Sequence, residues 1–290
     1  MSPSAVRVVA DDGFELPSTT FGEPGAARAG VVIAPAMGVE QRYYAPFAGW
    51  LAARGYFVAT FDYRGTGAAR PEAYRKSLAG FETDVTTWAT RDCRAIADFV
   101  ASRIGSRPLL WIGHSLGGQI FGLVPNRERA SAILMVAAAS GYKGYSAPSL
   151  RRKSLFLWHG IVPLSIAIKG YFPGAKLGIL SDLPAGAMQQ WRRWCLNPAY
   201  LVGVEGEPVR RSYAGVRQPI LSLLATDDEY VTAKAGEALL ALYPGAPREL
   251  RLVAPGDIGE RRIGHFGFFP KRFEESLWPL AERWLAAQVS

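Results

Sequence analysis

The stretch LLWIGHSLGGQIFG, residues 109–122, contains the pattern that decides the fold. Its first four residues are apolar, as in a strand buried on both faces, and the residues from Gln119 onward read as the start of a buried helix. Between them lies Ser115, with a glycine two positions before it and another two positions after it. A sharp strand-to-helix turn crowds its central residue, and only glycines at those positions leave room for the backbone. A glycine-rich turn with an incidental serine is the alternative. The pattern favours a strained turn that raises the Ser115 hydroxyl above a sheet.

The composition predicts one large globular domain with an extensive core, because the chain has 290 residues, of which 49% are hydrophobic and 20% charged. A net charge of +8 would permit contact with nucleic acid or an anionic membrane. The basic residues, however, are scattered singly and in short groups, without a recognition-helix or aromatic-basic motif. We therefore expect a solvated basic surface and no nucleic-acid partner.

The cysteines and the N-terminus indicate the class of protein. Cys93 and Cys195 form no CxxC pair and have no clustered histidines, so we expect no disulfide framework and no zinc site of the usual spacing. The serine chemistry argued below also requires no metal and no cofactor. The first residues, MSPSAVRVVADDGFELP, lack the apolar run of a secretory signal. The longest apolar stretch, LFLWHGIVPLSIAI from Leu155, is shorter than the roughly 20 residues of a membrane span. We expect a soluble, cytoplasmic protein.

Short apolar runs alternate with helix-like segments along most of the chain. This alternation predicts an α/β fold with a mostly parallel sheet that helices cover on both faces. The expected strands are residues 5–10, 14–21, 29–35, 56–63, 109–114, 130–139, 218–226 and 248–255, and the expected helices are residues 43–55, 84–105, 233–243 and 272–288.

Residues 141–213 break this alternation. They contain Trp158, Trp191 and Trp194 and no clean strand, and they are too many for a bare loop. We expect a helical cap here, inserted in a core domain made of residues 1–140 and 214–290.

A serine hydroxyl needs a neighbouring base, and the base needs a group that orients it. His114 directly precedes the serine and should point away from its hydroxyl, and His159 lies inside an apolar stretch. His265 follows the last expected strand, at the edge where parallel sheets place their sites, and is the expected base. Asp227 and Asp228 follow another strand, and at most one of them can reach His265 well, because neighbouring residues of an extended segment face opposite ways. The order serine, acid, histidine occurs in one known triad arrangement.

These motifs resemble the α/β-hydrolase superfamily over essentially the whole chain. The sequence is most similar to serine hydrolases related to serine aminopeptidases and monoacylglycerol lipases. The resemblance rests on GHSLGG at Gly113, FDYRGTG at Phe61, DDEYV at Asp227 and IGHFGFF at Ile263. It implies the α/β-hydrolase fold: a mostly parallel central sheet flanked by helices, with a helical cap insertion. In that family the acid usually lies three residues before a valine, and this register selects Asp228.

The chain departs from the family pattern after its first long strand. Many relatives carry His-Gly at that point, whereas this sequence has Pro35-Ala36. The oxyanion hole of the family uses the main-chain N–H that follows the dipeptide. The resemblance therefore assigns the two donors to the N–H groups of Met37 and Leu116. Because both donors are main-chain groups, losing His-Gly need not abolish the site.

Taken together, the residues and the resemblance predict a serine hydrolase that cleaves carboxylic esters or related small acyl compounds through an acyl-enzyme. Ser115 is the expected nucleophile, His265 the base and Asp228 the acid. An acyltransferase or another non-hydrolytic enzyme on the same scaffold is one alternative, and an inactive ligand-binding relative is another.

The substrate prediction depends on the apolar content of residues 141–213. A cap of this composition would surround the site with apolar side chains and favour an acyl chain, with Trp158 as a candidate substrate-binding residue. The alternative is that these side chains form a small core of the cap itself. Tyr43, near the oxyanion loop, is a second candidate, although it could instead pack beneath the pocket. The basic residues 151–153 and Lys169 suggest transient contact with an anionic membrane surface.

Overall fold

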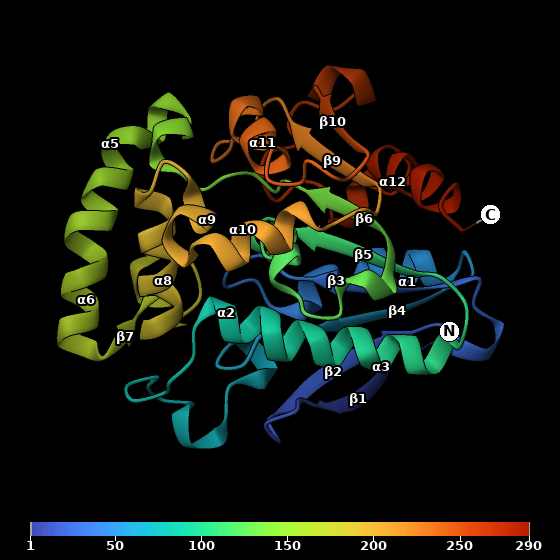
Figure 1. Ribbon diagram of the computed structural model, residues 1–290, viewed down its shortest axis with the longest axis horizontal. Helices are drawn as coiled ribbons and strands as arrows, with labels where there is room; N and C mark the ends of the chain where they lie inside the picture. Colours follow the sequence, from blue (N-terminus) through green and yellow to red (C-terminus); the bar gives the residue numbers. More distant parts are fainter. Residues whose placement is uncertain (1, 290) are drawn as a thin grey trace.

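The computed structural model describes residues 2–289, except for the side chains of residues 148, 149, 151 and 152. An eight-stranded sheet forms its centre, between two layers of helices (Figure 1). Only the pairings of β1 with β2 and of β2 with β4 are antiparallel, so the expected mostly parallel sheet is confirmed. In spatial order the strands are β1 (Ser4–Val9), β2 (Glu15–Phe21), β4 (Tyr56–Phe61), β3 (Ala29–Ala34), β5 (Leu109–His114), β6 (Ala130–Val136), β9 (Ile220–Ala225) and β10 (Arg248–Val253).

Strand β5 lies between β3 and β6 and is buried along its whole length. Leu110 and Ile112 belong to one apolar core, whereas Leu109 and Trp111 belong to the core on the opposite face of the sheet. A strand with both faces covered has no position for a solvated side chain, which explains its continuous apolar run.

The two cores are closed by different helices. The first is covered by α1 (Ala45–Ala52) and α12 (Leu277–Ala286). The second is covered by a continuous helix composed of α2 (Val85–Thr87), a π-helical turn (Trp88–Cys93) and α3 (Arg94–Ile104), together with α4 (Leu116–Gln119) and α11 (Ala233–Leu240).

The helix that follows β5 begins earlier than the sequence indicates. It runs from Leu116 to Gln119, the residue at which the sequence predicts a helix to start, and a 3₁₀ turn continues from Phe121 to Leu123. Pro125 explains why this turn does not continue, because the residue before a proline is disfavoured in the helical region, and Val124 has an extended conformation (φ −69°, ψ 121°).

The segment between β6 and β9 contains most of the remaining helices, which lie to the left in Figure 1. It also contains two short paired strands, where the sequence indicated none. The elements are α5 (Pro148–Phe156), a π-helical turn (Leu157–Ile161), α6 (Val162–Lys169), β7 (Tyr171–Phe172), α7 (Gly174–Leu177), β8 (Leu183–Pro184), α8 (Ala185–Leu196), α9 (Tyr200–Glu205) and α10 (Glu207–Ala214). We call residues 141–213 the insertion.

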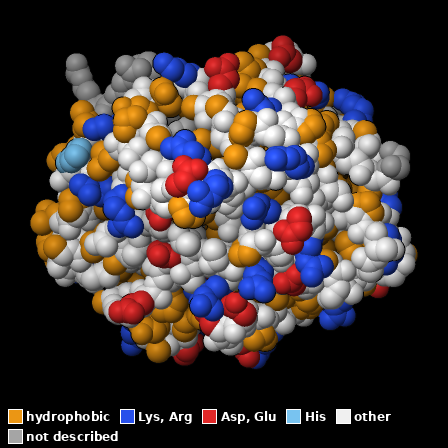
Figure 2. Space-filling view, in the orientation of Figure 1, with side chains coloured by type: hydrophobic (Ala, Val, Ile, Leu, Met, Phe, Trp, Pro, Cys, Tyr) orange, Lys and Arg blue, Asp and Glu red, His pale blue; other side chains and the backbone are white. Residues whose placement is uncertain are grey.

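Large apolar side chains are exposed on α5 and α6. Leu155, Phe156, Leu164 and Ile168 are each about half to two-thirds exposed. Figure 2 shows hydrophobic and basic side chains side by side along the left edge of the molecule, where these helices lie in Figure 1. Within residues 2–289, no helix is both long enough and apolar enough to cross a bilayer.

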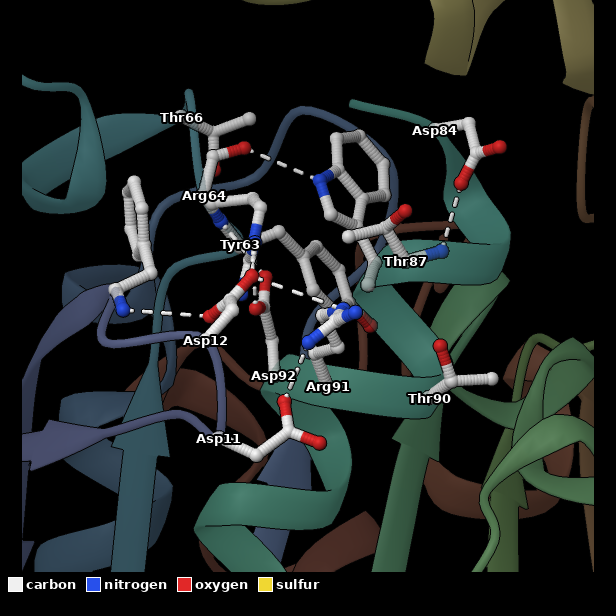
Figure 3. Close-up of polar contacts among 12 residues, drawn as sticks. Asp11, Asp12, Tyr63, Arg64, Thr66, Asp84, Thr87, Thr90, Arg91 and Asp92 are labelled. Carbon is white, nitrogen blue, oxygen red and sulfur yellow. Dashed lines mark hydrogen bonds and ion pairs between the residues drawn. The ribbon is translucent and has the colours of Figure 1, made fainter. Parts of the chain in front are cut away.

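A buried ionic network holds the loop that follows β4 (Figure 3). The Arg64 guanidinium contacts Asp92 at 2.7 Å and Asp12 at 2.5 Å, and the Arg64 N–H donates to Asp92. The Asp92 side chain is completely buried, and burial raises the pKa of its carboxyl to about 6 despite the guanidinium. The network fixes the loop after β4 at Arg64, next to the residues of the same loop that support the candidate site.

We expect Arg64→Met to lower the free energy of unfolding by about 3 kcal/mol at pH 7, because it leaves the Asp92 charge buried without its partner. Urea denaturation measures this loss. The loss should be smaller at pH 5, which lies below the Asp92 pKa of about 6, because Asp92 is then mostly protonated in the wild type as well as in the variant. Arg7→Met is the matched control: its pair with Glu15 is exposed, so the expected change is below about 0.5 kcal/mol. Equal losses in the two variants would contradict the assigned role of the network.

Candidate active site

Ser115 occupies the strained turn that its neighbours predict. Its backbone has φ 48° and ψ −111°, and α4 begins at the next residue. A Cβ added at Gly113 would lie 2.3 Å from the Gly118 nitrogen, and one added at Gly117 would lie 2.2 Å from the Ala34 carbonyl oxygen. Side chains at either position would collide with the backbone, so the expected need for both glycines is confirmed.

Asp228 and His265 meet at the carboxyl edge of the sheet, in the loops after β9 and β10. The Asp228 Oδ2 atom lies 2.8 Å from His265 Nδ1. The other oxygen, Oδ1, accepts hydrogen bonds from the Tyr230 and Val231 N–H groups, which fixes the carboxylate. Both side chains are buried, so the pair is shielded from water.

The acidic residues on either side of Asp228 hold the histidine loop. Asp227 accepts hydrogen bonds from the N–H groups of Ile263 and Gly264, at 3.0 and 3.1 Å. Glu229 accepts one from the His265 N–H at 3.1 Å. Sequence reasoning missed these roles, and the only signal for them is the run of three consecutive acidic residues.

His114 is buried and bonds both to a tyrosine and to the histidine loop. The His265 carbonyl can only accept, so His114 Nε2 carries the ring proton and donates to it, at 3.2 Å. Nδ1 of the neutral ring then accepts from the Tyr44 hydroxyl at 2.9 Å, and that hydroxyl in turn accepts from the Ala36 N–H. Burial, and then the neighbouring His265, lower the pKa of His114 to about 3, so its ring is neutral.

Two main-chain N–H groups near Ser115 have no acceptor among residues 2–289. Met37 and Leu116 are both buried, and neither N–H appears among the hydrogen bonds of the described residues. The loop that carries Met37 is fixed on both sides by the Ala36–Tyr44 hydrogen bond, by a bond from the Tyr63 hydroxyl to the Pro35 carbonyl, and by Asp62, which accepts from Gln41. These tyrosines provide support for the loop that its Pro35-Ala36 sequence does not reveal.

A cavity of about 470 Å³ connects these groups. Its wall includes Ser115, His265 and Met37, together with Trp158 from the insertion. Most of its other side chains are apolar and come from the insertion, including Leu157, Ile161, Leu180, Met188 and Trp191.

Tyr43 does not line this cavity, which corrects its expected place in the substrate site. Its hydroxyl donates to the Phe266 carbonyl, and its ring packs against Tyr44, His114 and Phe269. Burial raises the pKa of Tyr43 to about 12. Tyr43 therefore supports the histidine loop from outside the cavity.

The remaining sequence candidates lie away from these groups. His159 is exposed on the insertion and is not packed. Of the basic residues expected at a membrane, Arg151 and Arg152 have side chains outside the described part of the chain. Among the residues that the structure describes, no group of three or more His, Cys, Asp or Glu side chains could hold a metal ion.

Solved structures similar to this one are α/β hydrolases. A soluble variant of monoglyceride lipase from Saccharomyces cerevisiae, in complex with a substrate analogue, matches with a TM-score of 0.72 and 15% identity, covering 100% of this chain and 96% of that chain. The monoacylglycerol lipase of Paleococcus ferrophilus matches with a TM-score of 0.62 and 15% identity, covering 94% and 99%. An esterase domain from Rhodothermus marinus matches with a TM-score of 0.61 and 16% identity, covering both chains completely. The expected α/β-hydrolase fold is thereby confirmed.

Sequence comparison adds the family. No curated protein matches the chain significantly. The model of one family, described as serine aminopeptidase, S33, matches residues 25–170, which are half of the chain and include the turn at Ser115. The chain therefore belongs to the serine aminopeptidase, S33, family.

Proposed function

We propose that the protein is a serine hydrolase that cleaves carboxylic esters, with Ser115 as nucleophile, His265 as base and Asp228 as acid. The contact between His265 Nδ1 and the fixed Asp228 carboxylate carries the proposal, because it leaves Nε2 of the same ring to receive the Ser115 proton. Ser115 and His265 also share the wall of one cavity. Two of the similar structures are lipases and one is an esterase domain, which agrees with an ester substrate.

The acylation step uses these groups as follows. The Ser115 oxygen attacks the ester carbonyl and passes its proton to His265 Nε2, while the unpaired N–H groups of Met37 and Leu116 bind the developing oxyanion. The C–O bond to the alcohol then breaks, and the alcohol leaves with the proton from His265. No hydrogen bond joins the Ser115 hydroxyl to His265 among the described residues, as is common before substrate binds.

Water completes the reaction. His265 removes a proton from a water molecule, which attacks the acyl-enzyme carbonyl, and the same proton returns to Ser115 as the acid leaves. Asp228 stabilises the imidazolium that forms in each half-reaction.

The insertion acts as a cap on a core of residues 1–140 and 214–290. The location of its apolar side chains in the cavity wall supports this division. Within the described part of the chain, the cavity wall contains no carboxylate that could bind the free amino terminus of a peptide. The cavity is therefore better suited to an apolar acyl group than to an aminopeptidase substrate.

Contact of the cap with an anionic lipid surface stays a prediction. The exposed apolar side chains of α5 and α6 support this prediction. One of them, Phe156, also lies at the cavity wall, so the exposed apolar surface adjoins the cavity. Lys153 and Lys169 bring positive charge to the same helices.

Ser115→Ala should lower ester turnover by roughly four orders of magnitude or more, because the nucleophile is lost while the oxyanion donors remain. Turnover of a 4-nitrophenyl ester and covalent labelling with a fluorophosphonate measure this loss. His159→Ala serves as the control, since this histidine is exposed, and it should keep wild-type turnover. Labelling of Ser115→Ala at the wild-type rate would refute the nucleophile, whereas absence of labelling in the wild type would favour an inactive relative.

Asp228→Asn should reduce kcat by about 10,000-fold, because an amide neither holds the required tautomer of His265 nor stabilises its cation. Asp227→Asn should cost only about tenfold, since its carbonyl oxygen can still accept one loop hydrogen bond. Steady-state kinetics on one ester compares the two variants. A larger loss at Asp227 would reverse the assignment of the acid.

The cap predicts a dependence of turnover on acyl length. For 4-nitrophenyl esters from acetate upward, kcat/KM should rise about twofold to fourfold for each methylene that the apolar cavity buries. Trp158→Ala should weaken this rise while leaving acetate turnover nearly unchanged. Leu155→Ala is the matched control, because Leu155 lies in α5 just before the π-helical turn that carries Trp158, is 48% exposed and is outside the cavity wall. An efficiency that ignores acyl length would exclude the cavity as the acyl site.

A further inference from the structure

Gln119 is a buried polar residue in the wall of an otherwise mostly apolar cavity. It lies four residues after Ser115, at the end of α4, and only 4% of it is exposed. Residues four apart on a helix lie on the same side, so the Gln119 amide faces the cavity one turn beyond the nucleophile. The esterase mechanism proposed above does not use it.

A tyrosine of the insertion fixes the orientation of this amide. The Tyr200 hydroxyl lies 2.7 Å from Gln119 Oε1. Burial raises the pKa of Tyr200 well above its usual range, so the hydroxyl keeps its proton and donates it to Oε1. The Gln119 amide nitrogen is thereby directed away from Tyr200. Within the described residues, this nitrogen donates to no protein acceptor. It is not completely buried, and because Gln119 lines the cavity, we place its exposed surface there.

The backbone at Tyr200 is held in a strained conformation. Tyr200 has φ 54°, a conformation that side chains other than glycine rarely adopt. A Cβ at Gly141 would lie 3.0 Å from both the Tyr200 hydroxyl and Cys195 Sγ, so close approach of the tyrosine requires that glycine. The Tyr213 hydroxyl also donates to the main-chain carbonyl of Gln119, at 2.6 Å. Strain of this kind persists where surrounding contacts enforce it, and it is common at binding sites.

We propose that the Gln119 amide nitrogen donates a hydrogen bond to a second oxygen of the substrate, distinct from the carbonyl under attack. The substrate class is then an ester that carries a further acceptor, such as an ether, keto or hydroxyl oxygen. This inference rests on the proposed esterase function. An apolar group placed against the amide would leave a buried donor unpaired, so Gln119 discriminates against plain hydrocarbon at that point.

The experiment compares pairs of esters in which one methylene is replaced by oxygen. In the acyl arm, 4-nitrophenyl hexanoate is compared with the 2-propoxyacetate, 3-ethoxypropanoate and 4-methoxybutanoate esters. In the alcohol arm, butyl hexanoate is compared with 2-methoxyethyl hexanoate. For each pair, the ratio of kcat/KM for the oxygen-containing ester to kcat/KM for the methylene ester is measured. The ratio in the wild type is then divided by the ratio in Gln119→Met, so that the intrinsic reactivity of each ester cancels.

The expected quotient is about threefold to tenfold in one arm, the size of one neutral hydrogen bond, and the arm that responds identifies which part of the substrate carries the oxygen. Tyr200→Phe should lower the wild-type ratio in the same arm, because the amide is no longer oriented. Gln190→Met is the matched control: Gln190 is buried, but its amide bonds Thr86 and Glu205 outside the cavity wall, so its ratio should equal that of the wild type.

The proposal is overturned if neither Gln119→Met nor Tyr200→Phe changes the ratio in either arm while turnover still depends on Ser115. Turnover that does not depend on Ser115 would instead overturn the proposed function. If Gln119→Met fails to fold, as its thermal transition would reveal, Tyr200→Phe provides the same test through the same ratio.

Discussion

The close approach of three backbone segments at the end of β5 is the constraint on which the rest of the site depends. Gly113 lies against Gly118, and Gly117 lies against the Ala34 carbonyl of β3. With no side chains between them, the strand can turn directly into α4, and Ser115 is forced into its strained conformation. The same turn places the Leu116 N–H at the start of a helix and opposite the loop after β3. Backbone packing thus positions the proposed nucleophile and the Leu116 N–H, whereas the Met37 N–H also depends on the side-chain hydrogen bonds that hold its loop.

Side-chain hydrogen bonds then join the loops around this turn. Tyr44 bonds the Ala36 N–H of the oxyanion loop and the His114 ring, and His114 bonds the carbonyl of His265. This sequence of contacts depends on a neutral His114, which burial ensures by lowering its pKa to about 3. This link between the loop of His265 and the loop of Met37 therefore consists of uncharged groups, whereas the carboxylates of Asp227 and Glu229 hold the His265 loop separately.

Local rules make much of this architecture predictable from sequence. Strand β5 and the turn at Ser115 follow from an apolar run and two glycines, because their causes lie within a few residues. The choice between Asp227 and Asp228 has no such local cause: both follow β9, and only the family register separates them. Tyr43 and the Asp227 and Glu229 contacts could not be assigned, since each depends on where the loop of residues 262–269 lies in space. The sequence does not indicate that α4 starts at Leu116, because Gly117 and Gly118 are poor helix formers and the apolar run resumes only after Gln119.

The two tyrosines that meet at Gln119 also restrict how the insertion can move. Tyr200 and Tyr213 bind it to α4 near its end, and the Thr232 hydroxyl holds the Tyr145 carbonyl near its beginning. Between these attachments, Asp182 pairs with Arg70 and Gln190 of α8 bonds Thr86, so the middle of the insertion is fixed to the core as well. The attachments at Tyr200 and Tyr213 both act on Gln119, at the end of the short helix that begins directly after Ser115. A movement of the whole insertion would therefore pull on α4 and disturb the geometry around Ser115.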